Sequence, residues 1–215
     1  MNIIKGCLFD LDGVIVDTAK YHYLAWKRLA EELGFEFSRE DNERLKGVSR
    51  MTSLNILLEI GGVQVDEATK LEMADKKNNW YVAYIKEIDK TEILPGVEEY
   101  IKVLKKKGIK LGIGSASKNT MTILRNIGMV EYFDVIIDGT KVTNAKPDPE
   151  VFLLGARELN LMPKECVVFE DAEAGIEAAK NAGMHSIGIG KPEVLKHADK
   201  VISGFENLDA DILKF

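Results

Sequence analysis

The sequence has little cysteine, no excess of basic residues and no long apolar run. Its 215 residues include 2 cysteines, Cys7 and Cys166, which lie far apart within apolar stretches. That placement argues against a disulfide framework or a zinc site and predicts two buried thiols in a reducing compartment. Lysine and arginine number 29 against 35 acidic residues, a net charge of −6. An acidic chain is a poor candidate for binding nucleic acid, which depends on neutralising phosphates with basic side chains.

The sequence also lacks a membrane or export signal. No apolar run approaches the roughly 20 residues that a transmembrane helix requires. The first residues, MNIIKGCLFDLDG, place acids directly after a short apolar run and contain no small-residue cleavage site, so we expect no signal peptide. The 46% of hydrophobic residues is normal for a globular protein with a packed core. We therefore expect a cytoplasmic protein with no membrane or nucleic-acid partner.

Two segments, 1–15 and 93–215, alternate short apolar runs with helical patterns that end at glycine. This alternation predicts an α/β catalytic domain with a doubly wound, Rossmann-like parallel sheet. The expected strands are Ile3–Phe9, Lys110–Ser115, Val135–Asp138, Cys166–Glu170, His185–Ile189 and Lys200–Ile202. The expected helices are Val97–Lys107, Thr120–Ile127 and Ala172–Ala182, and Asp148-Pro149 is predicted to be the N-cap and first residue of another.

Residues 16–92 contain no strand pattern and are predicted to form a four-helix domain inserted after the first strand. In the first helix an apolar stripe comprises Ala19, Tyr23, Trp26, Ala30 and Leu33. The next three helices are predicted to begin after the N-caps Ser38, Ser49 and Asp66. The last of them is expected to run to Ile88, with one face formed by Leu71, Ala74, Asn78, Tyr81 and Ile85. The linkers to this domain fall near Val14–Thr18 and Glu92–Gly96.

Polar residues follow four of the expected strands. Asp10 and Asp12 come directly after the first, and because residues i and i+2 of an extended chain point the same way, both carboxylates can converge at the sheet's ligand-binding edge. Ser115, Lys146 and the pair Glu170-Asp171 follow later strands. Each group alone also fits an ordinary turn or helix cap. Together they supply a carboxylate nucleophile, a hydroxyl donor, a cation and an oxygen-ligand site that suits Mg²⁺.

The order Asp10-Leu11-Asp12-Gly13, Ser115, Lys146, Glu170-Asp171 resembles the four motifs of the haloacid dehalogenase superfamily. The resemblance spans the whole chain, and the helical insertion stands where that superfamily places its cap domain. Further strings resemble the β-phosphoglucomutase family within it: Asp17-Thr18-Ala19-Lys20-Tyr21-His22, Ala25-Trp26, Lys46-Gly47-Val48-Ser49-Arg50 and Ser115-Ala116-Ser117-Lys118-Asn119. This resemblance implies an Mg²⁺-dependent phosphomutase that interconverts β-D-glucose 1-phosphate and glucose 6-phosphate through a phosphoaspartyl enzyme and β-glucose 1,6-bisphosphate.

The resemblance also implies a role for each core residue. Asp10 would be the nucleophile and Asp12 the general acid and base. One Mg²⁺ ion would be held by Asp10, the main-chain carbonyl of Asp12, Glu170 and Asp171. Lys146 would reduce the repulsion between Asp10 and the phosphate. Ser115 and the amide of Ala116 would bind the transferring phosphate.

A mutase needs a second phosphate pocket opposite the nucleophile, because the bisphosphate must rebind in the reverse orientation. Arg50 suits that pocket because its planar guanidinium can bind a phosphate through two donors, and the string from Lys46 and Gly47 to Arg50 favours this role. The resemblance implies that Ser117, Lys118 and Asn119 contact the same phosphate from the core side. His22 and Lys77 are implied to form a gate near Asp12, and Thr18 to orient Asp12. For Trp26 both packing and sugar contact stay open, with packing favoured.

Three other functions remain possible from the sequence. A cap-bearing, Mg²⁺-dependent phosphatase of small sugar phosphates would share every core residue. A non-catalytic protein could be phosphorylated at Asp10 as a switch, although the intact acid, metal and cation groups argue against it. A halide-releasing hydrolase would work without Mg²⁺. We expect a monomer, because the cap must move freely.

Overall fold

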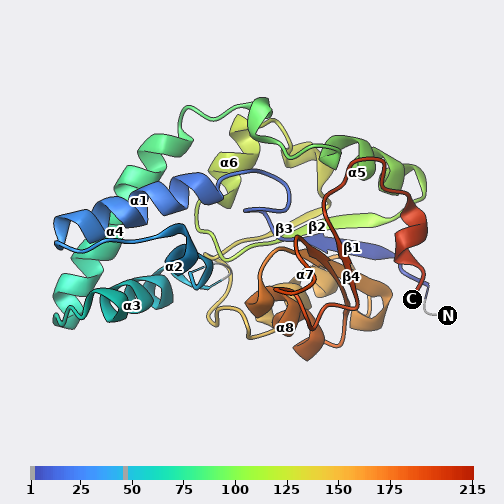
Figure 1. Cartoon of the computed structure of the whole chain (residues 1–215). Coiled ribbons are helices and arrows are strands. Elements are labelled where there is room, and N and C mark those ends of the chain that lie inside the picture. Colours follow the sequence, from blue (N-terminus) through green and yellow to red (C-terminus); the bar gives the residue numbers. More distant parts are fainter. Residues whose placement is uncertain (1–2, 46–47) are drawn as a thin grey trace.

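The computed structural model describes residues 3–45 and 48–215. Its centre is a sheet of six parallel strands in the order β3-β2-β1-β4-β5-β6 (Figure 1). The strands are β1 (Gly6–Phe9), β2 (Lys110–Gly114), β3 (Val135–Ile137), β4 (Cys166–Glu170), β5 (His185–Ile189) and β6 (Lys200–Ile202). The predicted doubly wound parallel α/β fold is confirmed. Strand β1 lies at the middle, between β2 and β4, so the residues that follow it enter the crevice at the carboxyl edge.

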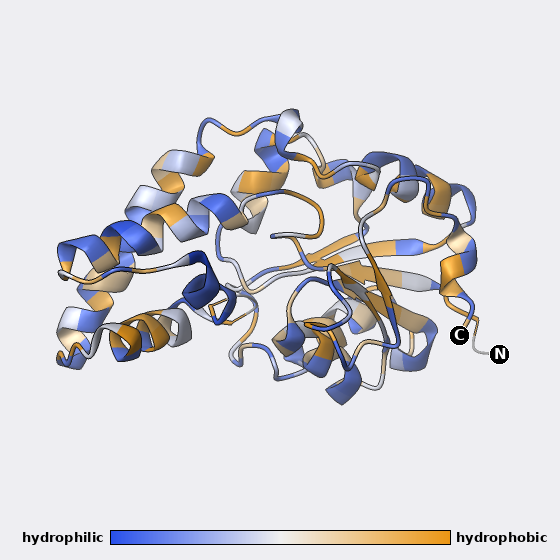
Figure 2. Ribbon diagram, viewed as in Figure 1, coloured by the Kyte–Doolittle hydropathy of each residue, from blue (hydrophilic) through white to orange (hydrophobic). Residues whose placement is uncertain are grey.

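Both faces of the sheet are covered by helices. The helices α5 (Val97–Lys106) and α6 (Thr120–Asn126) lie on one face, and α7 (Glu150–Glu158) and α8 (Glu173–Asn181) lie on the other (Figure 1). Side chains of β1 alternate between the two layers: Cys7 and Phe9 join one apolar cluster and Leu8 the other. Figure 2 shows apolar residues concentrated along the strands and on the helix sides that face them. Both cysteines are buried and unpaired, as predicted.

Four helices between β1 and α5 form a separate group, here called the helical insertion. They are α1 (Ala19–Glu32), α2 (Arg39–Glu43), α3 (Arg50–Gly61) and α4 (Glu67–Ile85). The three predicted N-caps are confirmed, because Ser38, Ser49 and Asp66 each accept a hydrogen bond from the backbone N–H three residues later. The group has its own apolar cluster, which includes Trp26 and Leu54.

The predicted face of α4 is confirmed at Ala74, Tyr81 and Ile85, which are buried, but it is wrong at Leu71 and at the end of the helix. Leu71 is 58% exposed, and α4 ends at Ile85 instead of Ile88. The buried line of this helix runs through Ala74, Lys77 and Tyr81. A buried lysine thus replaces an apolar residue on the packed face, and Leu71 lies outside that line.

Several other boundaries differ from the expectation by a few residues. Strand β1 begins at Gly6 instead of Ile3, and β2 and β3 each end one residue early. Asp148 is not the N-cap of α7: Pro149 takes that position, and Asp148 accepts a hydrogen bond from the Glu150 N–H at 2.9 Å. The helices α5, α6 and α8 are likewise shorter than predicted at their ends. Across the described ranges, none of the helices combines the length and apolarity that a membrane crossing needs.

The two linkers to the helical insertion lie against each other. The Asp17 N–H donates to the Glu92 carbonyl at 2.8 Å, and the Leu94 N–H donates to the Ile15 carbonyl at 3.0 Å. Val16 also forms two isolated β-bridges, one with Asp12 in its own linker and one with Ile93 in the other linker. The insertion is therefore connected to the sheet through two short linkers that pair with each other. The first of them follows β1 directly, beside the residues at the carboxyl edge.

Candidate active site

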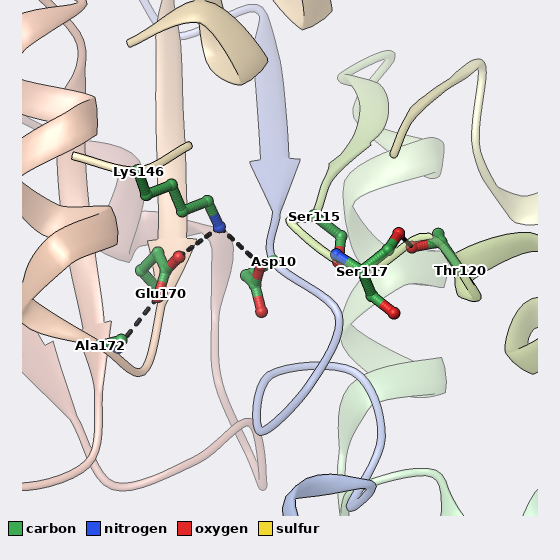
Figure 3. A network of polar contacts seen from close by, with 7 residues as sticks. All are labelled: Asp10, Ser115, Ser117, Thr120, Lys146, Glu170 and Ala172. Atoms are coloured by element: carbon green, nitrogen blue, oxygen red, sulfur yellow. Dashed lines mark hydrogen bonds and ion pairs between the residues drawn. The ribbon is translucent and has the colours of Figure 1, made fainter. Parts of the chain in front are cut away.

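The first strand delivers Asp10 to the carboxyl edge of the sheet. The Asp10 N–H donates to the Phe169 carbonyl at 2.9 Å, which fixes the backbone beside β4. The Lys146 ammonium donates to Asp10 Oδ1 at 2.6 Å and to Glu170 Oε1 at 2.5 Å. Figure 3 shows this ammonium between the two carboxylates, with Ser115 on the other side of Asp10. Residues far apart in the chain therefore meet because their strands are neighbours.

Burial and the neighbouring charges together determine the protonation of this cluster. The Lys146 and Glu170 side chains are 1% and 0% exposed. Burial alone would lower the pKa of Lys146, but the charges of Asp10 and Glu170 raise that pKa above its usual value. Burial raises the pKa of Glu170, and the negative charge of Asp10 raises it further. The positive charge of Lys146 lowers this pKa but does not cancel the rise. The ammonium is thus a fixed positive charge beside Asp10.

Three carboxylates could hold a cation. One oxygen from each of Asp10, Glu170 and Asp171 lies within 4.8 Å of the others. Gly13 leaves space for this group, because a Cβ at that position would lie 2.3 Å from Asp171 Oδ2. The Ala172 N–H donates to the second oxygen of Glu170 at 2.9 Å and fixes its orientation. An all-oxygen set of this kind fits Mg²⁺.

Asp12 lies two residues beyond Asp10 and has a different environment. The Thr18 hydroxyl donates to Asp12 Oδ1. Burial, then the charge of Asp10, raises the pKa of Asp12 from 3.8 to about 6, against the opposing effects of the hydrogen bond from Thr18 and the charges of Lys77 and Lys146. A carboxyl group with a pKa near neutrality can both accept and return a proton.

His22 and Lys77 meet although 55 residues separate them. Lys77 Nζ lies 2.8 Å from His22 Nδ1 and 4.4 Å from the centre of the Trp26 ring. The His22 ring stacks on Tyr81 with centroids 3.9 Å apart. Burial, then the charge of Lys77, holds the pKa of His22 well below its usual value. Burial, then the charge of Arg50, lowers the pKa of Lys77 to about 7. These shifts favour a neutral imidazole beside Lys77, and the tautomer of His22 decides which of the two nitrogens donates the hydrogen bond.

A cavity of about 290 Å³ lies between the strand ends and the helical insertion. It brings together many of the predicted site residues: Asp10, Asp12, His22, Trp26, Arg50, Lys77, Ser115, Ala116, Ser117, Lys118, Asn119 and Asp171. Thr18, Lys146 and Glu170 do not line it and instead lie buried behind the lining residues. Lys46 and Gly47 fall outside the described residues. Trp26 both packs in the apolar cluster of the insertion and lines the cavity.

The cavity also contains polar residues that the sequence did not single out. Asn42 and Ser53 line it although they are only 8% and 4% exposed. Asn78 lines it from α4. The sign for Asn78 in the sequence is an amide within an otherwise apolar stripe, although the helical spacing by itself predicts only a place on the packed face of α4. Arg50 lines it from α3, also on the insertion, and its Nη1 lies 3.5 Å from Asp75 Oδ1.

Comparison with known proteins identifies the family. A family model described as haloacid dehalogenase-like hydrolase matches residues 7–189. The chain belongs to this family. It is 42% identical to β-phosphoglucomutase of Bacillus subtilis over 98% of this chain and 94% of that protein. It is 35% identical to a phosphorylated carbohydrates phosphatase of Thermotoga maritima, over 86% of this chain and 84% of that protein.

A solved structure agrees with the sequence comparison. The crystal structure of β-phosphoglucomutase from Clostridium difficile is 45% identical, with a TM-score of 0.93 over 98% of this chain and 96% of that chain. The sequence-based assignment to the haloacid dehalogenase superfamily is confirmed. The chain is therefore an enzyme of this family, similar to mutases and phosphatases of phosphorylated sugars.

Proposed function

We propose that the protein is a β-phosphoglucomutase that interconverts β-D-glucose 1-phosphate and glucose 6-phosphate through β-glucose 1,6-bisphosphate. The observation that carries this proposal is one cavity that Asp10 lines from the sheet side and Arg50 lines from the helical insertion. Asp10 with its fixed ammonium from Lys146 lies at the sheet edge, and Arg50 lies on the helical insertion. The similarity to two β-phosphoglucomutases supports the same choice.

Asp10 acts as the nucleophile in this proposal. One of its carboxylate oxygens attacks phosphorus, and the bond from phosphorus to the sugar oxygen breaks. Lys146 offsets the repulsion between the carboxylate and the anionic phosphate. Ser115 and the Ala116 amide bind the transferring phosphate. Mg²⁺, held by Asp10, the Asp12 carbonyl, Glu170 and Asp171, would supply further positive charge.

Asp12 moves the proton. It donates to the sugar oxygen that leaves and later accepts the proton of the sugar hydroxyl that attacks phosphoaspartate. Thr18 holds the carboxyl group through its hydroxyl. The His22–Lys77 pair faces the same cavity from the insertion and gates access to Asp12.

The second phosphate binds at the far end of the cavity. Arg50, Ser117, Lys118 and Asn119 form this end, and all four line the cavity. The bisphosphate released from Asp10 turns round and binds again with its phosphates exchanged. Residues 16–92 act as a cap on the paired linkers, and their closure keeps water from phosphoaspartate. We expect the enzyme to work as a monomer.

The test is a product assay with β-glucose 1-phosphate, Mg²⁺ and a trace of β-glucose 1,6-bisphosphate. We expect glucose 6-phosphate to form, and Asp10→Asn to abolish the reaction. Inorganic phosphate without glucose 6-phosphate would instead favour the Mg²⁺-dependent sugar phosphatase that the Thermotoga maritima relative suggests. Turnover that does not need Mg²⁺, or no turnover on any sugar phosphate, would contradict both functions.

A further inference from the structure

Asn119 stands at a helix N-terminus but does not cap it. It occupies the N-cap position of α6, and its side chain makes no capping hydrogen bond. Asparagine is among the best N-caps because its side-chain oxygen accepts a bond from the first turn. Here the Asn119 amide instead donates from Nδ2 to Asn78 Oδ1 at 3.1 Å, 41 residues away on α4. A residue that breaks a local rule in this way is often part of a functional site.

The contact joins the two walls of the cavity. Asn119 follows β2 on the sheet side, Asn78 belongs to the helical insertion, and both line the cavity. The loop backbone is already fixed by its own bonds: the Asn119 N–H donates to Ser117 Oγ at 3.2 Å, and the Thr120 hydroxyl donates to the Ser117 carbonyl at 2.8 Å. Asn78 therefore does not hold the loop together. What it fixes is the direction of the Asn119 amide.

That amide can serve two partners at once. An asparagine NH₂ group carries two hydrogens, and Asn78 accepts only one of them. The other can donate to an oxygen in the cavity. We propose that Asn78 is a positioning residue that aims the Asn119 amide at the far phosphate and thereby couples phosphate binding to closure of the helical insertion. The inference rests on the proposed function, because it requires a substrate with a second phosphate.

Phosphate binding and closure of the insertion are coupled because both use the Asn119 amide. With the insertion closed, the Asn78 oxygen orients the Asn119 amide before the phosphate arrives, so less rotational freedom is lost on binding. Binding then favours the closed arrangement by the same factor, since two linked equilibria influence each other equally. Phosphate at the far end would therefore help to seal the end at which Asp10 reacts.

The chain offers a matched control. The Asn126 amide donates from Nδ2 to the Ile85 carbonyl at 2.9 Å and also connects α6 with α4. Neither residue lines the cavity. Asn126→Ala therefore removes a comparable bond between the same helices without touching the site.

The experiment is a double-mutant cycle on ligand binding. The Asp10→Asn protein is titrated with β-glucose 1,6-bisphosphate by calorimetry, alone and with Asn78→Ala, Asn119→Ala or both. We expect each change to weaken binding about two- to tenfold, the range of one hydrogen bond, and the pair to weaken it no more than Asn119→Ala does. With Asp10 intact, Asn78→Ala should raise KM for the bisphosphate more than it lowers kcat. Asn126→Ala should change binding less than twofold.

Unchanged binding in Asn78→Ala, additive effects in the double variant, or an equal loss in Asn126→Ala would overturn the inference. The mutase assay of the wild-type protein judges the proposed function separately. If the bisphosphate binds but the wild type yields only inorganic phosphate, the proposed function fails and the cycle still decides the role of Asn78. If the bisphosphate does not bind at all, both are wrong.

Discussion

The carboxylate of Asp12 should reduce the stability of the protein at neutral pH. Burial and the charge of Asp10 raise its pKa from 3.8 to about 6. Each pKa unit corresponds to about 1.36 kcal/mol, which gives an upper limit of about 3 kcal/mol. Asp12 is partly open to the cavity, and solvent screening reduces the effect, so we expect about 1–2 kcal/mol. Asp12→Asn removes this charge and keeps an oxygen that can accept from Thr18.

The variant should therefore be more stable and less active. At pH near 7.5 we expect Asp12→Asn to raise Tm by about 2–8 °C, since 1 kcal/mol shifts Tm by about 2–4 °C in a chain of this size. Mutase turnover should fall about 10²- to 10⁴-fold, because the proton transfer is lost. Thermal unfolding in the presence of EDTA measures the first effect, and the product assay measures the second.

The pH dependence identifies the cause. The folded state binds the Asp12 proton more tightly than the unfolded state, so stability falls as pH rises from about 4 through about 6. The gain from Asp12→Asn should be largest above pH 6 and vanish near pH 4, where the carboxyl group is protonated in both states. Asp17→Asn, an exposed change in the same linker, should give no such gain. A loss of stability at pH 7.5, or a gain independent of pH, would refute this reasoning.

Other substitutions test the remaining parts of the site. Lys146→Met leaves Asp10 and Glu170 buried without their cation, so the free energy of unfolding should fall by about 3–5 kcal/mol in urea titrations; unchanged stability would contradict the pairing. Removing Mg²⁺ with EDTA should stop turnover and lower Tm, and Asp171→Asn should weaken the Tm increase that added Mg²⁺ produces; an unaltered response would place the ion elsewhere. Arg50→Ala should raise KM for the bisphosphate about 10- to 100-fold, and Arg50→Lys should restore it only in part because lysine lacks the paired donors; full rescue would show that charge alone matters.

The sheet could be predicted because its signals are local. Each strand is a short apolar run, and a glycine follows several helices; Gly108, Gly128 and Gly183 all have positive φ. Parallel strands bring their carboxyl ends to one edge, so the positions after β1, β2 and β4 follow from the topology alone. The strand ends were predicted less closely, because the apolar residues Ile3 and Ile4 precede Gly6, the first paired residue of β1, and Ser115 lies beyond Gly114 although its N–H still donates to the Ile137 carbonyl at 3.0 Å.

The cap side of the site depends on contacts that no local pattern encodes. Lys77 is buried because α1 and α4 pack against each other. Its ammonium lies over the rings of Trp26 on α1 and Tyr81 on α4, and it contacts His22 on α1. Charge patterning would place such a lysine in solvent. The pairing of His22 with Lys77 was expected only from the family resemblance. The bond from Asn119 to Asn78 was not expected at all, because 41 residues separate the two and the helical spacing placed Asn78 on the packed face of α4.

The most direct test of the account is to locate the transferred phosphoryl group. The wild-type protein is mixed with β-glucose 1,6-bisphosphate and Mg²⁺, quenched in acid within the turnover time, and digested for peptide mass spectrometry. We predict one phosphate on the N-terminal peptide at Asp10, and none in the Asp10→Asn protein. A phosphate on His22 or Ser115, or a protein that turns over without any trapped phosphate, would contradict the assignment of Asp10 as the nucleophile.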